Sequence, residues 1–447
     1  MRRLMIAAMG SGSGKTAVTC GLLAALRRRN LSVQSFKCGP DYIDPMFHTQ
    51  VLGIPSRNLD LFLQGAEGTR HTLARQHAEF ALVEGAMGFY DGAGGSTDAS
   101  AWQVADTAGI PVVLVLRPQG SSLTLAAQVR GLQSFRAPSH LAGLLLNSCK
   151  PQLHAHLAPI LERETGLPVL GFLPPMEEAV FPSRHLGLLT AGEITDLSAR
   201  IEALAAQMER TVEIAGLLAL AGSAPAEIPP PASVSARCRI AVARDEAFCF
   251  LYEDNLDALR NSGAELVFFS PLRDQALPEG TTGLYLAGGY PELHAQALSQ
   301  NESMRQSICR AVGSGLPTVA ECGGFLYLQQ NLTGPSGTVW PMAGVLPGRG
   351  FPTGRLQRFG YVTLTAGADS LLLRRGEAVP AHEFHYWDCT ENGAALTARK
   401  AGREAAWPCG FASPTLYAAF PHLHFGGELP LARRFVDRAA RWKEERL

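Results

Sequence analysis

The sequence lacks several features that would place the protein in a special class. Its formal net charge is −1, so it has no excess of basic residues to attract nucleic acid. No apolar run reaches the roughly 18–20 residues that a membrane helix needs. The apolar start of the chain ends in a glycine-rich loop instead of a signal-peptide cleavage site. We therefore expect a cytoplasmic protein with no nucleic-acid partner and no membrane segment.

Paired cysteines are also missing. The nine cysteines are scattered, form no CxxC pair and show no spacing typical of a metal site. An odd, scattered set is typical of a reducing compartment, where most thiols are small buried hydrophobic side chains. The sequence thus indicates neither a disulfide framework nor a cysteine metal centre.

A proline-rich segment divides the chain. With 447 residues, the protein is too long for a single hydrophobic core. Residues 223–237 are rich in proline, alanine and serine, show no apolar periodicity and are typical of a linker. We predict domains at 1–222 and 238–447. In both halves, short apolar strands alternate with helical segments, which predicts an α/β fold with mainly parallel sheets.

The stretch GSGSGKT follows the first predicted strand and is typical of a phosphate-binding loop. Gly12 and Gly14 let backbone amides approach a phosphate, Lys15 reaches the terminal phosphates, and Thr16 is a Mg²⁺ ligand in such loops. The loop is a variant, because Met9 stands where the strict motif has glycine. The sequence therefore predicts ATP as a co-substrate and Mg²⁺ as a cofactor.

Charged side chains follow two other predicted strands. Lys37, Asp41 and Asp44 lie in FKCGPDYIDPMFH, and Glu84 and Asp91 lie in VEGAMGFYDG. Because ligands in open α/β sheets bind at the carboxyl ends of the strands, we expect these residues near the phosphate loop. Carboxylates there suit Mg²⁺, which prefers oxygen ligands. The alternative is that Asp41 and Asp44 cap helices or turns.

Two further polar positions have weaker support. Asn147 ends another predicted strand, where it would bind an adenine edge or serve as a turn residue. Arg184 and His185 lie in the loop FPSRHLGLL. A cation there would hold a substrate carboxylate, or it would be a solvated loop residue.

The stretch PTVAECGGFLYL places Cys322 on a tight turn between a predicted strand and a predicted helix. Gly323 and Gly324 allow the sharp turn, and a helix N-terminus favours the thiolate. Backbone amides after another strand, at Gly288 and Gly289, would form an oxyanion hole together with that of Gly323. The alternative is that Cys322 is a buried structural residue.

A cysteine nucleophile also needs a general base that activates it and protonates the leaving amine. Composition alone does not choose among four candidate histidines: His382, His385, His422 and His424.

Taken together, these motifs resemble those of the cobyrinate a,c-diamide synthase family, which are glutamine-dependent amidoligases of the cobalamin pathway. The resemblance covers almost the whole chain and rests on FKCGPDYIDPMFH, EGAMGFYDG, PSRHLG, GGYPEL, AECGGFLYL, HEFHYW and HLHF, in the order usual for that family. It implies an N-terminal P-loop domain similar to dethiobiotin synthetase and a C-terminal domain similar to class I glutamine amidotransferases.

The resemblance also implies roles for individual residues. Cys322 would be the glutaminase nucleophile and His422 the residue that activates it. Class I relatives often carry a glutamate two positions after this histidine, but His424 stands there, which leaves the third member open. It also places Lys15, Thr16, Lys37 and Glu84 at phosphate and metal positions, and Asp41, Asp44 and Asp91 in motifs around metal and substrate carboxylates. Together with the residue patterns above, the assignments are ATP binding by Gly12, Gly14, Lys15, Thr16, Lys37 and Asn147, metal binding by Thr16, Asp44 and Glu84, and substrate binding by Asp41, Asp91 and Arg184.

The implied reaction is amidation of the a and c carboxylates of cobyrinate through acyl phosphates, with glutamine as the ammonia source. Hydrogenobyrinate and nickel sirohydrochlorin are alternative acids. A P-loop switch ATPase is an alternative of another class, but it has no use for Cys322. An ammonia-only ligase with an inactive glutaminase half is a third reading. The sequence leaves a homodimer open.

Overall fold

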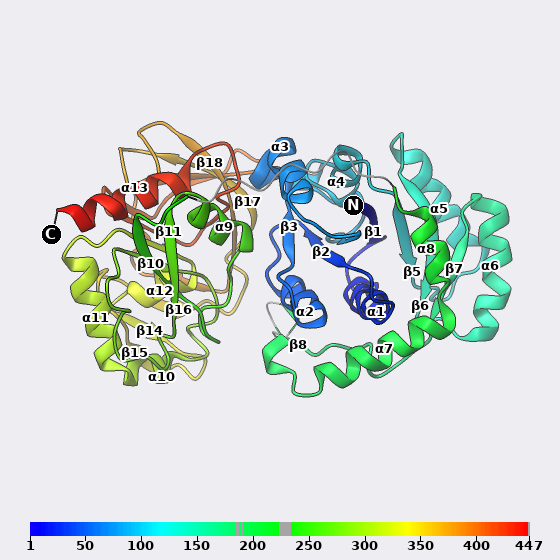
Figure 1. Ribbon diagram of the computed structural model, residues 1–447, viewed down its shortest axis with the longest axis horizontal. Coiled ribbons are helices and arrows are strands. Elements are labelled where there is room, and N and C mark those ends of the chain that lie inside the picture. Colours follow the sequence, from blue (N-terminus) through cyan, green and yellow to red (C-terminus); the bar gives the residue numbers. More distant parts are fainter. Residues whose placement is uncertain (185–186, 189–190, 223–233, 446–447) are drawn as a thin grey trace. The chain divides into compact units, whose positions relative to one another are not determined.

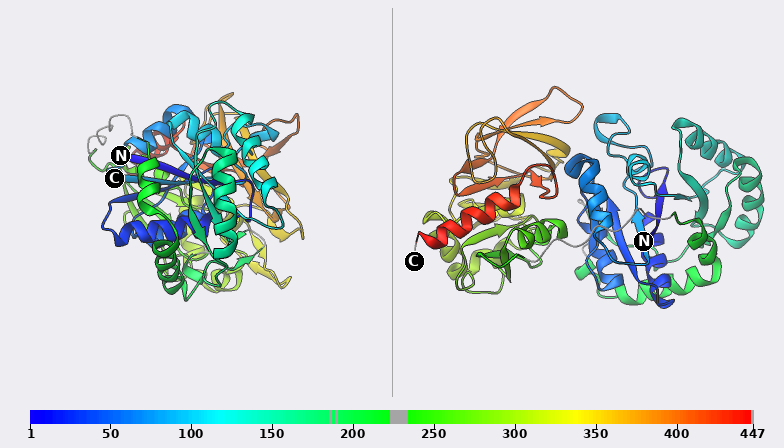
Figure 2. Two further views of the ribbon diagram at one scale, coloured as in Figure 1. Left: turned by 90° about the vertical axis from the view of Figure 1, so that its right-hand side faces the viewer. Right: turned by 45° about the horizontal axis from the view of Figure 1, so that its top comes forward.

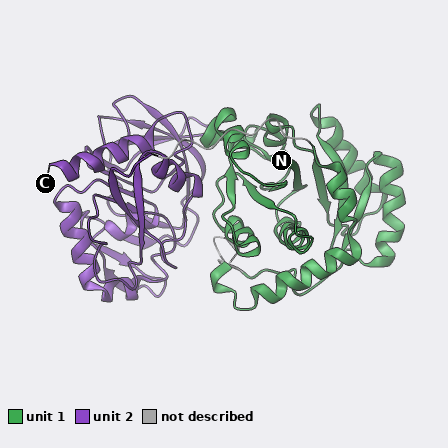
Figure 3. Ribbon diagram, in the orientation of Figure 1, with its two compact units in different colours: residues 1–230 green, residues 231–447 purple. Residues whose placement is uncertain are grey.

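The computed structural model describes residues 1–184, 187–188, 191–222 and 234–445. The chain forms two compact units, each with a central sheet and packed helices (Figures 1 and 2). The units comprise Met1–Pro230 and Pro231–Leu447 (Figure 3). This division falls within the predicted linker, most of which lies outside the described residues, so its limits at 223 and 237 stay a prediction.

The N-terminal unit is built on a seven-stranded parallel sheet with the order β3-β2-β4-β1-β5-β6-β7. Its strands are β1 (Arg2–Ala8), β2 (Val33–Cys38), β3 (Arg57–Leu59), β4 (Phe80–Glu84), β5 (Val112–Leu116), β6 (Leu141–Asn147) and β7 (Val169–Leu173). Strands such as β5 are buried along their whole length, and their sequences are therefore continuous apolar runs.

Helices cover both faces of this sheet. They are α1 (Lys15–Arg28), α2 (Ile43–Leu52), α3 (Leu61–Ala74), α4 (Ala101–Ala108), α5 (Leu123–Phe135), α6 (Pro151–Thr165), α7 (Leu197–Thr211) and α8 (Ile214–Leu220), with the 3₁₀ turns η1 (Ala93–Gly95) and η2 (Ala191–Glu193) and the short ribbon β8 (Ser183–Arg184) and β9 (Gly187–Leu188). Helix α1 packs against α2 and α7, whereas α5 packs against α6 (Figure 1). Side-chain caps fix several helix starts: Asp60 accepts the amides of Phe62 and Leu63 at α3.

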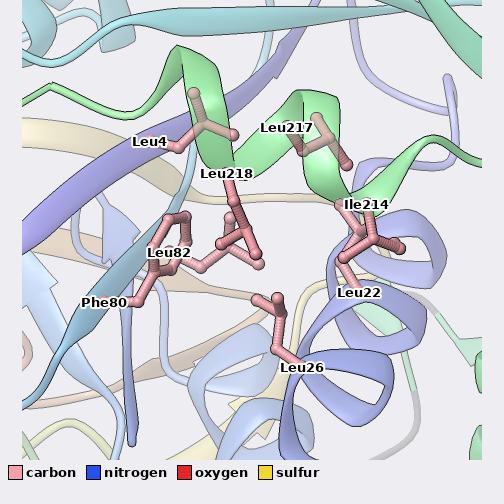
Figure 4. A pocket seen from close by; sticks show the side chains of 8 residues that line it. All are labelled: Leu4, Leu22, Leu26, Phe80, Leu82, Ile214, Leu217 and Leu218. Carbon is pink, nitrogen blue, oxygen red and sulfur yellow. The ribbon is translucent and has the colours of Figure 1, made fainter. Parts of the chain in front are cut away.

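The alternation of β1 separates the two faces. Met5 and Ala7 belong to the core that includes α4 and α5. Leu4 points the other way, toward α1 and α8, where it lines a small apolar cavity of about 10 Å³ (Figure 4). The cavity is lined by aliphatic and aromatic carbon and belongs to the core, so it is no candidate for a nucleotide or an acid.

The C-terminal unit has a six-stranded sheet with the order β11-β10-β12-β13-β23-β22, which is parallel except for the edge strand β22. Its strands are β10 (Cys238–Ala243), β11 (Ala264–Phe269), β12 (Gly283–Leu286), β13 (Thr318–Glu321), β22 (Phe411–Ser413) and β23 (Leu416–Ala419). The helices of this unit are α9 (Glu253–Asn261), α10 (Ala295–Gln300), α11 (Glu302–Gly313), α12 (Gly323–Leu328) and α13 (Leu431–Glu444). The predicted α/β class is confirmed for both units.

An addition that the sequence did not reveal is formed by the chain between α12 and β22, and one strand after β23 joins it. It consists of a five-stranded antiparallel sheet, β21-β20-β17-β18-β24, and a four-stranded mixed sheet, β15-β14-β16-β19. Their strands are β14 (Asn331–Thr333), β15 (Val339–Pro341), β16 (Arg349–Pro352), β17 (Arg358–Ala366), β18 (Ala378–His385), β19 (Trp387–Cys389), β20 (Leu396–Lys400), β21 (Ala406–Cys409) and β24 (His422–Leu423). After β23 the chain leaves the parallel sheet, and β24 pairs with β18, which places His382 opposite His422.

None of the helices in the described part of the chain has the length and apolar character needed to cross a bilayer. All nine cysteines are free thiols.

Candidate functional site

The phosphate loop connects β1 to α1 with the geometry that the sequence predicted. Gly12 and Gly14 have φ angles of 75° and 86°, which glycine adopts without steric cost. A Cβ on Gly14 would lie 2.0 Å from Asn147 Nδ2. That amide nitrogen donates a 2.8 Å hydrogen bond to the carbonyl of Ser13. Asn147 therefore supports the loop, and the adenine contact assigned to it stays a prediction.

Lys15 bends back over the loop. Its Nζ donates to the carbonyl oxygens of Gly10 at 3.1 Å and Met87 at 2.6 Å. Burial lowers the pKa of Lys15 to about 8, and the Lys37 charge lowers it further, whereas nearby carboxylates oppose the shift. Phosphate oxygens are stronger partners for an ammonium than neutral carbonyls. The side chain is thus placed to exchange carbonyl contacts for phosphate contacts.

An oxygen cluster lies beside the loop. Thr16 Oγ1 donates to Glu84 Oε1 at 2.9 Å and lies 3.3 Å from Asp44 Oδ1. Lys37 Nζ lies 2.5 Å from Asp44 Oδ2 and 3.0 Å from Glu84 Oε1. His48 Nε2 lies 2.7 Å from the other oxygen of Glu84. Burial raises the pKa of Glu84, but Lys37 and His48 outweigh it and hold that pKa well below its usual range.

The donor set of this cluster fits Mg²⁺. The ion prefers carboxylate and hydroxyl oxygens and commonly binds through one or two carboxylates, with waters and nucleotide phosphates completing its octahedron. Thr16 supplies a hydroxyl that lies within hydrogen-bond distance of two carboxylates, those of Asp44 and Glu84. In the described ranges, no group of three or more His, Cys, Asp or Glu side chains is arranged to hold a metal.

Asp41 performs the capping role that was the alternative for it. Its Oδ1 accepts the amides of Ile43 at 2.8 Å and Asp44 at 3.1 Å, so it fixes the start of α2. Its proposed contact with substrate stays a prediction.

Two more of the predicted substrate residues lie in loops of the same unit. Asp91 Oδ2 accepts the amide of Gly88 at 2.9 Å and closes the turn after β4. Arg184 ends the short strand β8, with its side chain, like the whole of His185, outside what the structure describes. The substrate roles of Asp91 and Arg184 stay predictions.

Cys322 occupies a strained turn between β13 and α12. Its φ of 46° and ψ of −100° are rare for a residue with a side chain, and such strain is typical of functional turns. Its amide donates to the carbonyl of Ala419 at 2.9 Å, and its side chain is buried. A Cβ on Gly324 would lie 2.2 Å from the carbonyl oxygen of Leu286, so only glycine fits there.

His422 lies next to Cys322 at the start of β24. Burial alone would lower the pKa of His422, but the nearby Cys322, with its hydrogen bond to the ring, and the Glu321 carboxylate raise it to about 10. A pKa this high favours the protonated imidazole at neutral pH. A Cβ on Gly288 would lie 2.4 Å from His422 Cε1, so glycine is required to seat the ring.

The predicted oxyanion residues gather around this pair. Gly288 touches the His422 ring, and the amide nitrogen of Gly289 lies 2.9 Å from where a Cβ on Gly323 would stand. Gly323 directly follows Cys322. The two loops that carry these amides therefore approach closely, although their role in binding an oxyanion stays a prediction.

The other candidate bases have different surroundings. His382 lies opposite His422 in the sheet, and burial lowers its pKa to about 3. The His385 ring stacks on Phe420 with centroids 3.9 Å apart. His424 Nδ1 accepts a 3.0 Å hydrogen bond from the backbone amide two residues later. Of the four histidines, His422 is the one with a hydrogen bond to the thiol.

Sequence reasoning missed two buried side chains of these sites, His48 and Glu321. His48 ends the motif FKCGPDYIDPMFH, whose carboxylates are the stronger signal for a metal site. Glu321 is a charged residue in an otherwise apolar buried strand, directly before the cysteine. A charge in such a strand was the signal that could have singled it out.

Comparisons with known proteins match each of the two units to a different domain family. Residues 4–188 match the model of the CobQ/CobB/MinD/ParA nucleotide binding domain, and residues 239–429 match that of the CobB/CobQ-like glutamine amidotransferase domain. A relative from Clostridium acetobutylicum named cobyrinate a,c-diamide synthase is 38% identical, with 98% of this chain and 100% of the relative covered. A relative of the same name from Synechococcus is 40% identical over 97% of each chain. The chain belongs to the cobyrinate a,c-diamide synthase family.

Membership of the cobyrinate a,c-diamide synthase family makes the protein a ligase with a glutamine amidotransferase domain and a nucleotide-binding P-loop domain. The alternative of a switch ATPase is therefore wrong. The solved MinD cell division protein of Aquifex aeolicus aligns with 51% of this chain and 100% of its own, at a TM-score of 0.31 and 14% identity. A structural likeness at this TM-score supports no inference about function.

Proposed function

We propose that the protein amidates the a and c carboxylates of cobyrinate, with ATP as the energy source and glutamine as the source of ammonia. One observation supports this most directly. A phosphate loop with an adjoining oxygen cluster and a Cys322–His422 pair occur in one chain, whose relatives over nearly the full length are named cobyrinate a,c-diamide synthase.

The N-terminal unit would activate the acid. A carboxylate is a poor electrophile, because its leaving group would be oxide. Transfer of the γ-phosphoryl group of ATP to a carboxylate oxygen gives an acyl phosphate and ADP. Lys15 is placed to bind the transferred group and balance its charge. Thr16, Asp44 and Glu84 would hold Mg²⁺, which when bound neutralises phosphate charge.

The C-terminal unit would release ammonia from glutamine. The Cys322 thiolate attacks the side-chain carboxamide carbon and forms a C–S bond. His422 gives its proton to the departing nitrogen as the C–N bond breaks, and ammonia leaves. Water then hydrolyses the thioester to glutamate and regenerates the thiolate. The amides of Gly289 and Gly323 would stabilise the negative oxygen that develops in both steps.

The two half-reactions join when ammonia attacks the acyl phosphate carbon and phosphate leaves. Neutral ammonia is the nucleophile, whereas free ammonium at neutral pH is not. Each amide therefore consumes one ATP, one glutamine and one water, and the diamide needs two rounds. This coupling explains why a glutaminase and a kinase-like site are useful in one chain.

Two matched variants test this division. Cys322→Ser should lose glutamate release and glutamine-dependent amidation, because a hydroxyl is a far weaker nucleophile than a thiolate. It should keep amidation with ammonium salts. Lys15→Met should lose amidation with either nitrogen source by roughly 100-fold or more, yet keep glutamate release. Cys309→Ser, at a partly accessible thiol in α11, is the control and should match the wild type.

The identity of the acid needs a direct comparison. Mass spectrometry of the products from cobyrinate, hydrogenobyrinate and nickel sirohydrochlorin, tested side by side, should give two amidations of cobyrinate with the highest kcat/KM. Preference for another acid would overturn the substrate and leave the two-site mechanism in place. Glutamine-dependent amidation by Cys322→Ser would overturn the mechanism itself.

A further inference from the structure

Glu321 approaches His422 from the end of the strand that delivers the nucleophile. It is the last residue of β13, and its side chain is 1% exposed. Its Oε2 lies 3.7 Å from His422 Nδ1. Among the described residues, His422 is the ion-pair partner that the structure gives this carboxylate. Since a histidine has two ring nitrogens, a carboxylate at Nδ1 leaves Nε2 for the sulfur of Cys322.

Neutral donors hold the Glu321 carboxylate in this place. The amide of Leu423 donates to Oε1 at 3.0 Å, and the hydroxyl of Tyr285 donates to Oε2 at 3.2 Å. Leu423 directly follows His422. The carboxylate is therefore fixed to the same backbone segment that carries the imidazole.

Asn255 strengthens this frame. Its Nδ2 donates to the carbonyl of Leu423 at 2.8 Å and lies 3.4 Å from the Tyr285 hydroxyl, and its Oδ1 accepts the amide of Phe425 at 2.7 Å. It is fully buried. Asn255 thus ties the segment after His422 to the tyrosine that orients Glu321. Such a network is expected to hold one geometry of the pair.

His424, which stands two residues after His422, makes contacts that stabilise the local turn. His424 Nδ1 accepts the amide of Gly426 at 3.0 Å, and its ring lies 5.0 Å from that of Tyr252. These contacts shape the turn after β24. A carboxylate for His422 therefore comes from the nucleophile strand, not from this turn.

We propose that Glu321 is the third member of the glutaminase arrangement, a positioning residue that holds His422 through Nδ1 so that the ring faces Cys322. This proposal rests on the proposed roles of Cys322 and His422. The 3.7 Å separation tightens to a hydrogen bond when glutamine is bound, as catalytic hydrogen bonds commonly do.

The energetics favour such a pair over a purely structural glutamate. An isolated buried carboxylate is costly, and two neutral donors offset only part of that cost. The imidazolium of His422 supplies the missing positive charge, and the carboxylate in turn stabilises the imidazolium. The titratable groups that face His422 are Cys322 and Glu321 from the nucleophile turn and His382, Glu383 and His385 from β18, and Tyr285 from β12 contacts Glu321.

The test compares Glu321→Gln with Glu321→Asp in the full chain. Glutamine keeps the shape and an acceptor for Leu423 but removes the charge, so glutaminase kcat should fall roughly 100-fold or more while the KM for glutamine changes little. The alkaline limb of kcat against pH should move to lower pH, because His422 loses the carboxylate that favours its protonated form. Aspartate keeps the charge and should retain the alkaline limb and a larger part of kcat.

His424→Asn is the matched control, since asparagine Oδ1 can accept the Gly426 amide in place of Nδ1. It should keep the wild-type kcat and pH profile. A Glu321→Gln variant with wild-type kcat and alkaline limb would overturn the proposal, as would a Glu321→Asp variant that loses as much activity as Glu321→Gln with the same profile.

A thermal unfolding transition shows whether each variant is folded. If Glu321→Gln does not fold, the retained or lost alkaline limb of Glu321→Asp decides. A wild-type protein without glutaminase activity that depends on Cys322 would instead contradict the proposed function.

Discussion

His48 Nε2 lies 2.7 Å from Glu84 Oε2, and neither side chain is exposed. His48 comes from α2 and Glu84 ends β4, so the contact joins a helix to the central sheet next to the phosphate loop. The other carboxylate oxygen accepts hydrogen bonds from Thr16 at 2.9 Å and Lys37 at 3.0 Å. Both oxygens of Glu84 thus have partners that orient them.

Replacing His48 should weaken the metal site without removing a proposed ligand. In His48→Leu the Glu84 carboxylate loses its imidazole partner, so its orientation is less well defined. The Mg²⁺ concentration for half-maximal amidation with ammonium salts should rise roughly 10–100-fold. Glutamate release should not change, because it takes place in the other unit.

His71→Gln is the control for this variant, since His71 lies on α3 with half of its side chain exposed. It should show the Mg²⁺ dependence of the wild type. An unchanged Mg²⁺ dependence in His48→Leu would mean that Thr16 and Lys37 orient Glu84 by themselves.

Local signals in the sequence explain what could be predicted. Strand β5 is an uninterrupted apolar run, and the turns at Gly14 and Cys322 depend on glycines within a few residues. Strand β17 is not such a run, because buried residues alternate with more exposed ones over its second half, Val362–Ala366, and its first four residues are all partly or fully exposed. Without such a run, the sequence did not indicate that the chain turns into an antiparallel sheet.

Contacts between distant residues explain what could not be predicted. The hydrogen bond from the Leu423 amide to Glu321 joins residues 102 positions apart, and the one from Asn147 to Ser13 joins residues 134 apart. No short motif carries such a pairing. The sequence therefore indicated which residue types serve the site, whereas the fold determines which of them support one another.

Gly288 offers a test of how tightly the glutaminase site is packed. In Gly288→Ala the new methyl group would lie 2.4 Å from His422 Cε1, far inside van der Waals contact, so the ring must move. A displaced ring no longer faces the sulfur correctly, and glutaminase kcat should fall roughly 10–100-fold. Amidation with ammonium salts should continue.

Gly313→Ala is the matched control, because a Cβ there meets nothing within 4 Å at the end of α11. Its glutaminase activity should equal that of the wild type. If Gly288→Ala were equally active, His422 would have room to move, and the close fit between the glycine and the ring would not matter for catalysis.

His382 should make the stability of the C-terminal unit depend on pH. Burial lowers the pKa of His382 to about 3 from its ordinary 6.5, so between those values the unfolded chain binds a proton that the folded chain does not. Stability should therefore be complete above pH 6.5 and fall as the pH decreases toward 3. One such proton contributes up to about 1.4 kcal/mol per pH unit to the free energy of unfolding.

The variant His382→Phe should reduce this slope. The ring already packs edge-on against Phe359 and Tyr361, and its Nδ1 has no hydrogen-bond partner in the described part of the chain, so an aromatic hydrocarbon suits the site. His385, whose pKa burial lowers to about 4, should keep a second part of the slope.

Urea unfolding at pH 6.5 and pH 5, followed by tryptophan fluorescence, measures this effect in the full chain. Four of the five tryptophans lie in the C-terminal unit, so the signal reports mainly on it. His294→Gln controls for the loss of a histidine and should keep the wild-type slope. If His382→Phe kept it too, His382 would be protonated in the folded state, and its contact with His422 across β18 and β24 would then oppose the positive charge on which the proposed glutaminase mechanism relies.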